Sequence, residues 1–120
     1  MKAKLVKNSF ANRDSLEVTQ EHKLDEGKTE YRLLPPKALR KVAEVLTFGA
    51  KKYSPHSWRF VESFRLLDAA YRHLETIRTG ELVDTESGLP HLAHAITNLM
   101  FILESQLEGL VNSDKDLGTR

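Results

Sequence analysis

Three histidines are the residues of this 120-residue chain best suited to chemistry. His91 and His94 lie at i and i+3 in a segment with helical periodicity, so both project from one face, and Asn98 continues that face at i+7. His73 lies in the preceding helical segment, where it borders the line of residues expected to face the core. If these two helices are antiparallel neighbours, His73 lies opposite His91 or His94.

The segment between these two helices supplies carboxylates, because it contains Glu81, Asp84 and Glu86. Histidines together with carboxylates are suitable ligands for a first-row metal such as Mn²⁺ or Zn²⁺, whereas Mg²⁺ prefers carboxylates alone. Two simpler interpretations stay open. The carboxylates are solvated turn residues, with Asp84 or Ser87 capping the next helix, and the histidines are surface residues.

A second group of residues combines cations with aromatic rings. Lys51, Lys52 and Tyr53 close one helical segment, and Trp58 and Arg59 follow it. Such cations are suited to phosphate, and such rings are suited to stacking on a nucleotide base. The alternatives are again structural, since the helix dipole alone favours lysines at a C-terminus. A lone tryptophan is also more often a core or interface residue.

Two further cations follow Gly27 and offer additional phosphate contacts, namely Lys28 and Arg32. The Gly-Lys pair lacks the upstream glycine of a P-loop, so the sequence does not predict a Walker-type nucleotide site.

Three stretches of helical periodicity predict the elements that position these residues, at 36–53, 60–79 and 90–108. Gly80 and Gly109 are suitable residues for ending the second and third helices. The apolar stripe of each helix is expected to face the core. These stripes consist of Leu39, Val42, Ala43, Leu46 and Ala50 in the first helix, Phe64, Leu67, Tyr71, Leu74 and Ile77 or Arg78 in the second, and Leu92, Ala95, Ile96, Leu99 and Leu103 in the third.

The sequence therefore predicts an all-α protein. Its compact helical bundle is expected to span 31–109, with an irregular N-terminal arm at 1–30 and a polar tail at 110–120. Phe101 and Ile102 broaden the apolar face of the third helix. A broad apolar face on a small bundle favours a homo-oligomer, either a dimer or a tetramer.

The composition excludes several classes of function. The net charge is +1, from 18 basic and 17 acidic residues, which argues against nucleic acid or an anionic membrane surface as a partner. The chain has no cysteine, and therefore neither disulfides nor thiolate metal sites. No apolar run approaches the roughly 18 residues of a membrane span, and the charged start lacks the apolar segment of a secretory signal. We therefore expect a cytoplasmic protein, in a bacterium or a phage-infected host.

Residues 22 to 104 follow the order of a known pattern. Its most specific stretches are Phe-Gly-Ala-Lys-Lys-Tyr at 48–53 and Gly-Leu-Pro-His-Leu-Ala-His-Ala at 88–95, preceded by Arg-Leu-Leu-Pro-Pro at 32–36. In these residues the chain resembles the phage-type dATP/dGTP diphosphohydrolase domain, a MazG-like group. The resemblance implies an all-α fold and a metal-dependent pyrophosphohydrolase that cleaves a purine deoxynucleoside triphosphate to monophosphate and pyrophosphate.

Under this resemblance the candidate residues take definite roles. The metal ligands, for Mn²⁺, Mg²⁺ or Zn²⁺, are expected to be His73, Asp84, His91 and His94. The residues expected to act as general base or as an additional ligand are Glu81 and Glu86. The expected contacts to phosphate, base and the rest of the nucleotide are Lys28, Arg32, Lys51, Lys52, Tyr53, Trp58, Arg72 and Asn98.

One difference from the wider MazG-like superfamily leaves a second function open. That superfamily binds metal through Glu-Glu-x-x-Glu on one helix and Glu-x-x-Asp on the next, whereas this chain has Arg72-His73-Leu-Glu75 and His91-Leu-Ala-His94. The alternative is a non-catalytic phage protein that binds or sequesters a nucleotide or a nucleotide-derived signal. A third hypothesis is a structural or interaction module without a ligand.

Overall fold

The computed structural model describes residues 24–110, and the chain divides into two units after Leu33. The described part of the first unit contains one 3-10 turn, η1 (Tyr31–Leu33), and buries none of its residues. The rest of the expected arm, at 1–23, and the expected tail from 111 onward lie outside the described residues.

The second unit contains the three predicted helices, and each begins and ends within about three residues of its expected bounds. They are α2 (Pro36–Lys52), α3 (Ser63–Arg78) and α4 (His91–Glu108). A short 3-10 turn that the sequence did not predict, η2 (Ser57–Phe60), precedes α3. The only β pairing in the described chain is an isolated bridge between Val83 and Pro90. The all-α prediction is therefore confirmed.

Proline and glycine set the ends of these helices. Pro36 occupies the first turn of α2, where the missing amide proton is not needed. Gly109 ends α4 with a φ of 67°, a left-handed conformation that glycine adopts without strain. Pro90 is the N-cap of α4, and no side chain caps this helix. The interpretation of Asp84 or Ser87 as a helix cap is therefore wrong.

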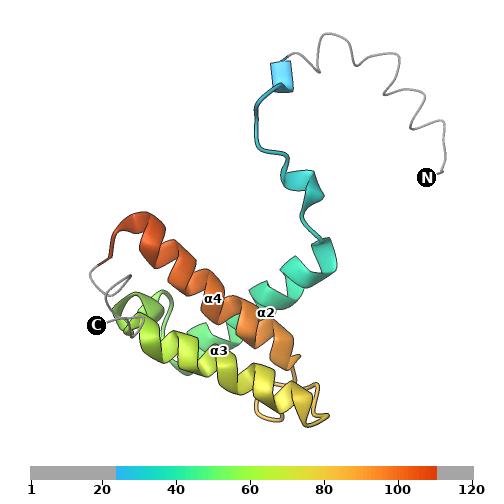
Figure 1. Ribbon diagram of the computed structural model, residues 1–120, viewed down its shortest axis with the longest axis vertical. Helices are drawn as coiled ribbons and strands as arrows, with labels where there is room; N and C mark the ends of the chain where they lie inside the picture. The colour runs from blue at the N-terminus through green and yellow to red at the C-terminus, as the bar shows by residue number, and fades with distance from the viewer. Residues whose placement is uncertain (1–23, 111–120) are drawn as a thin grey trace, which may run out of the picture. The chain divides into compact units, whose positions relative to one another are not determined.

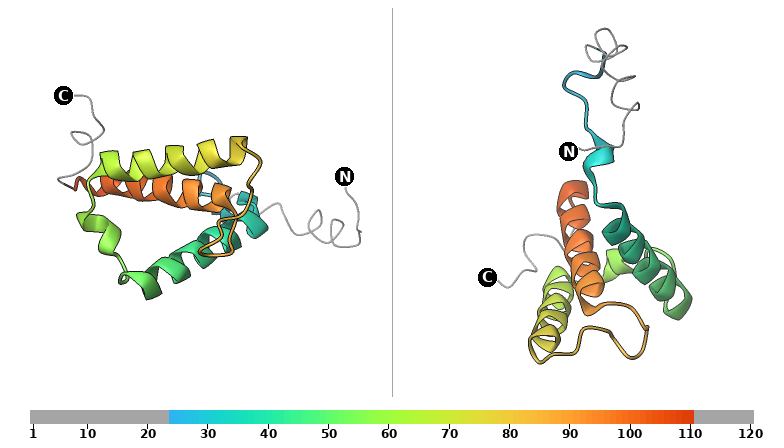
Figure 2. Two further views of the ribbon diagram at one scale, coloured as in Figure 1. Left: turned by 90° about the horizontal axis from the view of Figure 1, so that it is seen from below. Right: turned by 90° about the vertical axis from the view of Figure 1, so that its right-hand side faces the viewer.

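α4 is the central helix of the second unit. It packs along α3, with which it is antiparallel, and less extensively against α2 (Figure 1, Figure 2). The most enclosed residues of the α3–α4 pair are small: Ser63, Ala70, Ala95 and Ser105 are at most 1% exposed. Small side chains let two helices approach closely and still fill the space between them.

This close packing turns most of the predicted core stripes outward. Of the stripe residues only Val42 and Ala95 are buried, and the buried face of α2 also includes Val45. The stripe residues that stay exposed, contrary to the prediction, are Leu39, Ala43, Leu46, Phe64, Tyr71, Leu74, Arg78, Leu92, Ile96, Leu99 and Leu103. The stripes were correctly identified as helical, but the residues buried inside the chain are mostly others: small residues together with Leu66 and Ile102 on α3 and α4, and Val45 on α2.

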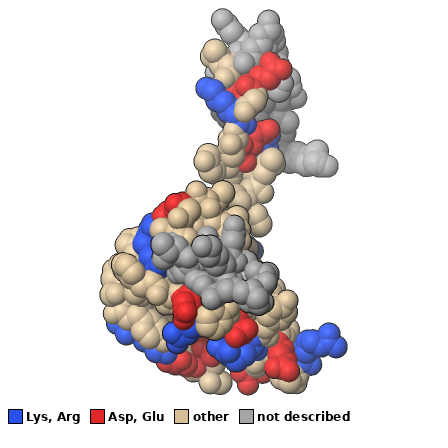
Figure 3. All heavy atoms as spheres, turned by 60° about the vertical axis from the view of Figure 1, so that its left-hand side comes forward, with Lys and Arg blue, Asp and Glu red and all other residues tan. Residues whose placement is uncertain are grey.

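No helix in the described part of the chain combines the length and the apolar character that a membrane crossing requires. On the face drawn in Figure 3, basic and acidic side chains of the helical unit are interspersed, and neither sign gathers into a patch.

Candidate functional site

A cavity of about 1140 Å³ lies among the C-terminal half of α2, η2, α3 and α4. Its volume is slightly above the usual range of about 300–1,000 Å³ for small-molecule sites, and it is large enough for a nucleotide. Most of the residues singled out in the sequence meet in its lining: Lys51, Lys52, Tyr53, Trp58, His73, Asp84, Glu86, His94 and Asn98. Residues of the histidine cluster and of the cationic and aromatic group therefore line one cavity.

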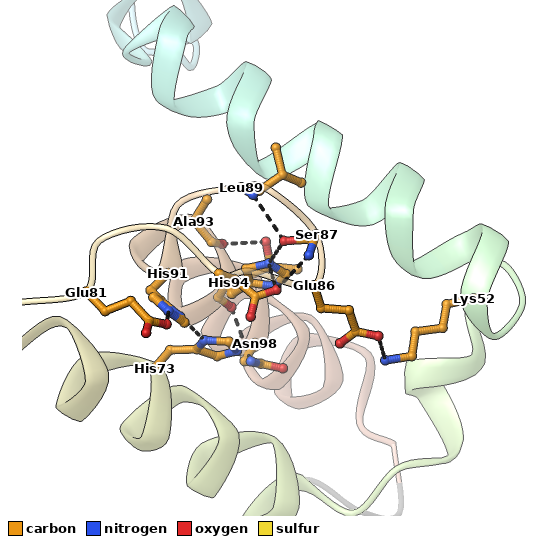
Figure 4. Close-up of polar contacts among 12 residues, drawn as sticks. Lys52, His73, Glu81, Glu86, Ser87, Leu89, His91, Ala93, His94 and Asn98 are labelled. Atoms are coloured by element: carbon orange, nitrogen blue, oxygen red, sulfur yellow. Dashed lines mark hydrogen bonds and ion pairs between the residues drawn. The ribbon is translucent and has the colours of Figure 1, made fainter.

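One ion pair links opposite walls of the cavity. Lys52 Nζ, at the end of α2, lies 2.5 Å from Glu86 Oε2 in the loop before α4 (Figure 4). The hydrogen bond to Glu86 raises the pKa of Lys52. The same ammonium lies 5.2 Å from the centre of the Tyr53 ring, which is largely exposed. A cation and an aromatic ring therefore lie side by side in the lining of the cavity.

The three histidines form one cluster between α3 and α4. His73 Nδ1 lies 2.9 Å from His91 Nδ1, and the His73 ring stacks on His94 with 4.8 Å between ring centres and 11° between planes (Figure 4). His91 Nε2 lies 2.7 Å from Glu81 Oε2, and His94 Nε2 lies 2.7 Å from Ser87 Oγ. The ring of His73 is thus fixed by both of the others.

The loop between α3 and α4 holds the carboxylates beside this cluster through its backbone. The His91 amide donates to the Leu82 carbonyl, and the Asp84 amide donates to the Leu89 carbonyl. Asp84 Oδ2 accepts the Ser87 amide at 3.0 Å and lies 3.6 Å from His94 Nε2. Asp84 therefore organises the loop as well as facing the cavity.

Burial sets the charge of this cluster. Burial lowers the pKa of His73, and the neighbouring His94 and His91 lower it further. Burial also lowers the pKa of His94, although Asp84 opposes the effect. Burial acts to raise the pKa of Asp84, but its hydrogen bonds from Ser87 outweigh this and hold the pKa below its usual value. Near neutral pH the cluster therefore has two uncharged histidines beside an ionised carboxylate.

Trp58 is partly committed to packing. Its ring stacks on Phe101, with 4.9 Å between centres and 7° between planes, and the Arg59 guanidinium lies 4.9 Å from the ring centre. Arg59 in turn pairs with Glu108 at the end of α4. One face of the tryptophan ring is therefore covered, which favours the structural interpretation and leaves Tyr53 as the more accessible ring for a base.

Three residues of this site were not predicted to belong to it from the sequence, although Ser87 was considered as a helix cap. Ser87 contacts His94, Phe101 covers Trp58, and Arg65 lines the cavity from α3. Phe101 was noticed only for the breadth of its helix face, and an isolated arginine such as Arg65 carries no signal in sequence. Phe101 and Arg65 are brought to the site by the packing of the helices, and Ser87 by the folding of the loop before α4.

Five of the predicted site residues do not line the cavity. Glu81 and His91 lie behind its wall and reach it only through His73. Arg72 is exposed on α3, next to His73 but outside the lining. Lys28 and Arg32 belong to the other unit of the chain. The roles expected of these five residues stay predictions.

The histidines and carboxylates suit a first-row metal in kind but not in arrangement. Within residues 24–110 no group of three or more His, Asp or Glu side chains is placed to hold a metal ion. The nitrogen atoms of His73 and His91 that face each other are joined by a hydrogen bond, so they do not both point toward a common ion. A metal site that used both of these nitrogens would require at least one of the two rings to turn.

Comparison with known proteins agrees with the family resemblance. The family model for the N-terminal domain of dATP/dGTP diphosphohydrolase matches residues 18–115. A dATP/dGTP diphosphohydrolase of Salmonella phage PMBT28 is 41% identical over 80 residues, which are 67% of this chain but only 28% of that protein. No solved structure matches this chain. Because the family model covers most of its length, the chain belongs to the family of dATP/dGTP diphosphohydrolase N-terminal domains.

Proposed function

We propose that the cavity binds a purine deoxynucleoside triphosphate and that the chain acts in its cleavage to monophosphate and pyrophosphate. The observation that carries this proposal is the meeting, in one cavity, of Lys51, Lys52 and Tyr53 with the His73–His94–Asp84 wall. The cations match the charge of a polyphosphate, and the tyrosine ring offers a surface for the base. The name of the phage relative, a dATP/dGTP diphosphohydrolase, supplies the substrate class.

A divalent metal, Mn²⁺, Mg²⁺ or Zn²⁺, is part of this proposal. Such an ion would offset charge on the polyphosphate and polarise it. The donors that line the cavity include those of His73, His94 and Asp84, which together suit Mn²⁺ or Zn²⁺ better than Mg²⁺. Because these donors do not converge in the described chain, we assign no reaction step to the ion.

A second candidate function is nucleotide binding without hydrolysis, with catalysis residing elsewhere. Two observations favour it: the absence of a ready metal group in residues 24–110, and the small share of the phage relative that this chain spans. In that case the cavity would hold the nucleotide for a partner domain or would sequester it. Either function suits a protein of the bacterial cytoplasm.

We also propose that the chain forms a homo-oligomer through the apolar stripe of α4. Leu92, Ile96, Leu99 and Leu103 are 53%, 38%, 45% and 54% exposed, and their 4-3-4 spacing is that of a helix-pairing seam. Such a seam is self-complementary, as a two-fold interface requires. The occupant proposed for it is therefore a second copy of this chain.

Pyrophosphate release is the assay that separates the two candidate functions. The purified protein is incubated with each of the four deoxynucleoside triphosphates and with Mn²⁺, Mg²⁺ or Zn²⁺, and binding is followed in parallel by thermal shift. We expect purine-specific product and stabilisation, both reduced in Lys52→Ala but not in Lys37→Ala, since Lys37 is exposed on α2 outside the cavity. Stabilisation without product under every metal would select the binding function. No stabilisation by any nucleotide would reject both.

A further inference from the structure

We propose that Glu81 and His91 are positioning residues that keep His73 in a single tautomer, with the lone pair of its Nε2 available to the cavity. This inference deepens the function proposed above and rests on it for the ligand, but the tautomer itself is independent of any nucleotide. Glu81, His91 and His73 form a continuous chain of hydrogen bonds from the surface to the cavity wall (Figure 4).

The Glu81 carboxylate determines which atoms donate and which accept in this series of hydrogen bonds. An ionised carboxylate only accepts hydrogen bonds, so the contact of 2.7 Å between Glu81 Oε2 and His91 Nε2 places the proton on His91 Nε2. In a neutral imidazole the other nitrogen is then unprotonated. His91 Nδ1 is therefore an acceptor.

The second contact passes this constraint to His73. Two unprotonated nitrogens facing each other at 2.9 Å would repel, so one of the pair must carry a proton. Because His91 Nδ1 is the acceptor, His73 Nδ1 is the donor. His73 Nε2 is consequently unprotonated, and within residues 24–110 it has no hydrogen-bond partner.

Burial separates the roles of the two histidines. His91 is only 4% exposed and does not line the cavity, whereas His73 does. Stacking on His94 holds the plane of the His73 ring at a small angle, so the direction of the lone pair is fixed as well as its existence. His91 and Glu81 thus act on His73 as a hydrogen-bonded partner acts on a ligand-binding histidine: they orient the ring and fix its tautomer.

A fixed lone pair in the cavity can bind two kinds of partner. One is an O–H or N–H donor, from a bound nucleotide or from water bound with it. The other is a divalent cation. Both need the same unprotonated nitrogen. A freely exchanging His73 would offer this nitrogen only part of the time, and binding would be weakened by that fraction.

Nitrogen-15 NMR of the histidine rings tests the tautomer directly. The metal-free, nucleotide-free protein is measured at pH 8, above the ordinary histidine pKa of about 6.5, where a neutral ring shows distinct signals for its protonated and unprotonated nitrogens. We expect His73 to show a protonated Nδ1 and an unprotonated Nε2, with His91 in the opposite tautomer. His73 protonated on Nε2, or averaging between both tautomers, would overturn the proposal, as would a doubly protonated His91.

Three variants test the role of the two positioning residues. His91→Leu removes the acceptor. Glu81→Ala, a change at a half-exposed side chain, removes the constraint on His91. Both are expected to release His73 into a mixture of tautomers. His91→Asn keeps an oxygen near the position of Nδ1 and should preserve the Nδ1-protonated form of His73. An unchanged His73 tautomer in both Glu81→Ala and His91→Leu would refute the positioning role.

Two additions then identify what the lone pair serves. A change in the His73 Nε2 resonance on adding Zn²⁺ alone assigns a cation, and a change on adding dATP alone assigns a hydrogen-bond donor. In Glu81→Ala the affinity of that ligand should fall in proportion to the fraction of His73 left in the competent tautomer, by about twofold for an equal mixture. If dATP binds but neither addition moves this resonance, the lone-pair role is wrong while the proposed nucleotide function stands. If dATP does not bind while the tautomer is as expected, the nucleotide function fails and the positioning role remains.

Discussion

Replacing Leu99 and Leu103 by lysine should dissociate the oligomer proposed for this chain. The two side chains are 45% and 54% exposed on α4, so roughly half of each remains to be buried in an interface. Full burial of a leucine is worth about 1.5–3 kcal/mol, so the exposed half is worth about 1 kcal/mol. Two such residues from each of two copies give about 4 kcal/mol, which is close to a thousandfold in the dissociation constant.

The assay for this prediction is sedimentation velocity over a wide range of protein concentration. The unmodified chain is expected to sediment as a dimer or tetramer, and Leu99→Lys/Leu103→Lys as a monomer with unchanged helical circular dichroism. The matched control is Glu75→Lys, which changes the net charge by the same two units at an exposed position of α3. A double variant that sediments like the unmodified chain, or an unmodified chain that is monomeric at about 100 µM, would show that a second copy does not cover this stripe.

The electrostatics and packing of the site give three further predictions. Burial lowers the pKa of both His73 and His94, so the unfolded chain binds protons at a higher pH than the folded chain. The free energy of unfolding of the metal-free protein, measured by urea titration, should have its full value above about pH 6.5, the pKa of a histidine in the unfolded chain. As the pH falls from there toward the lower folded pKa values, it should decrease with a slope of up to about 2.7 kcal/mol per pH unit. A constant value from pH 7 to 5 would contradict this. Glu86→Gln frees Lys52 from its ion pair and should tighten metal-free dATP binding by calorimetry, whereas equal or weaker binding would show that the pair does not compete with phosphate. Ser105→Ala removes a buried hydroxyl that has no hydrogen-bond partner among the described residues. The change should leave stability unchanged or raise it by about 1 kcal/mol in thermal unfolding, so a clear loss of stability would reveal a partner.

The sequence predicted the helices well because their signals are local. A proline at the first turn of α2 and a glycine with positive φ after α4 act on the backbone beside them. The choice of the inward face is not local. Leu92 and Leu103 were expected inside because they are apolar, but the chain instead encloses the small residues of α4, which allow α3 to approach. Hydrophobic periodicity finds a stripe without saying whether the same chain or another copy covers it.

The sequence allowed us to predict which residues of the candidate site lie near one another, but not the role of each residue. Spacing placed His91 and His94 on one face of a helix, and the antiparallel pairing of α3 with α4 brings His73 to them, as expected. A difference of three residues nevertheless rotates a side chain by about 60° around the helix axis. That rotation decides that His94 lines the cavity while His91 turns behind it, where the folded loop brings Glu81 within hydrogen-bond distance. Periodicity therefore identifies which residues can act together, and only the packing of the loop against the helix start decides which of them meets the ligand and which one orients its neighbour.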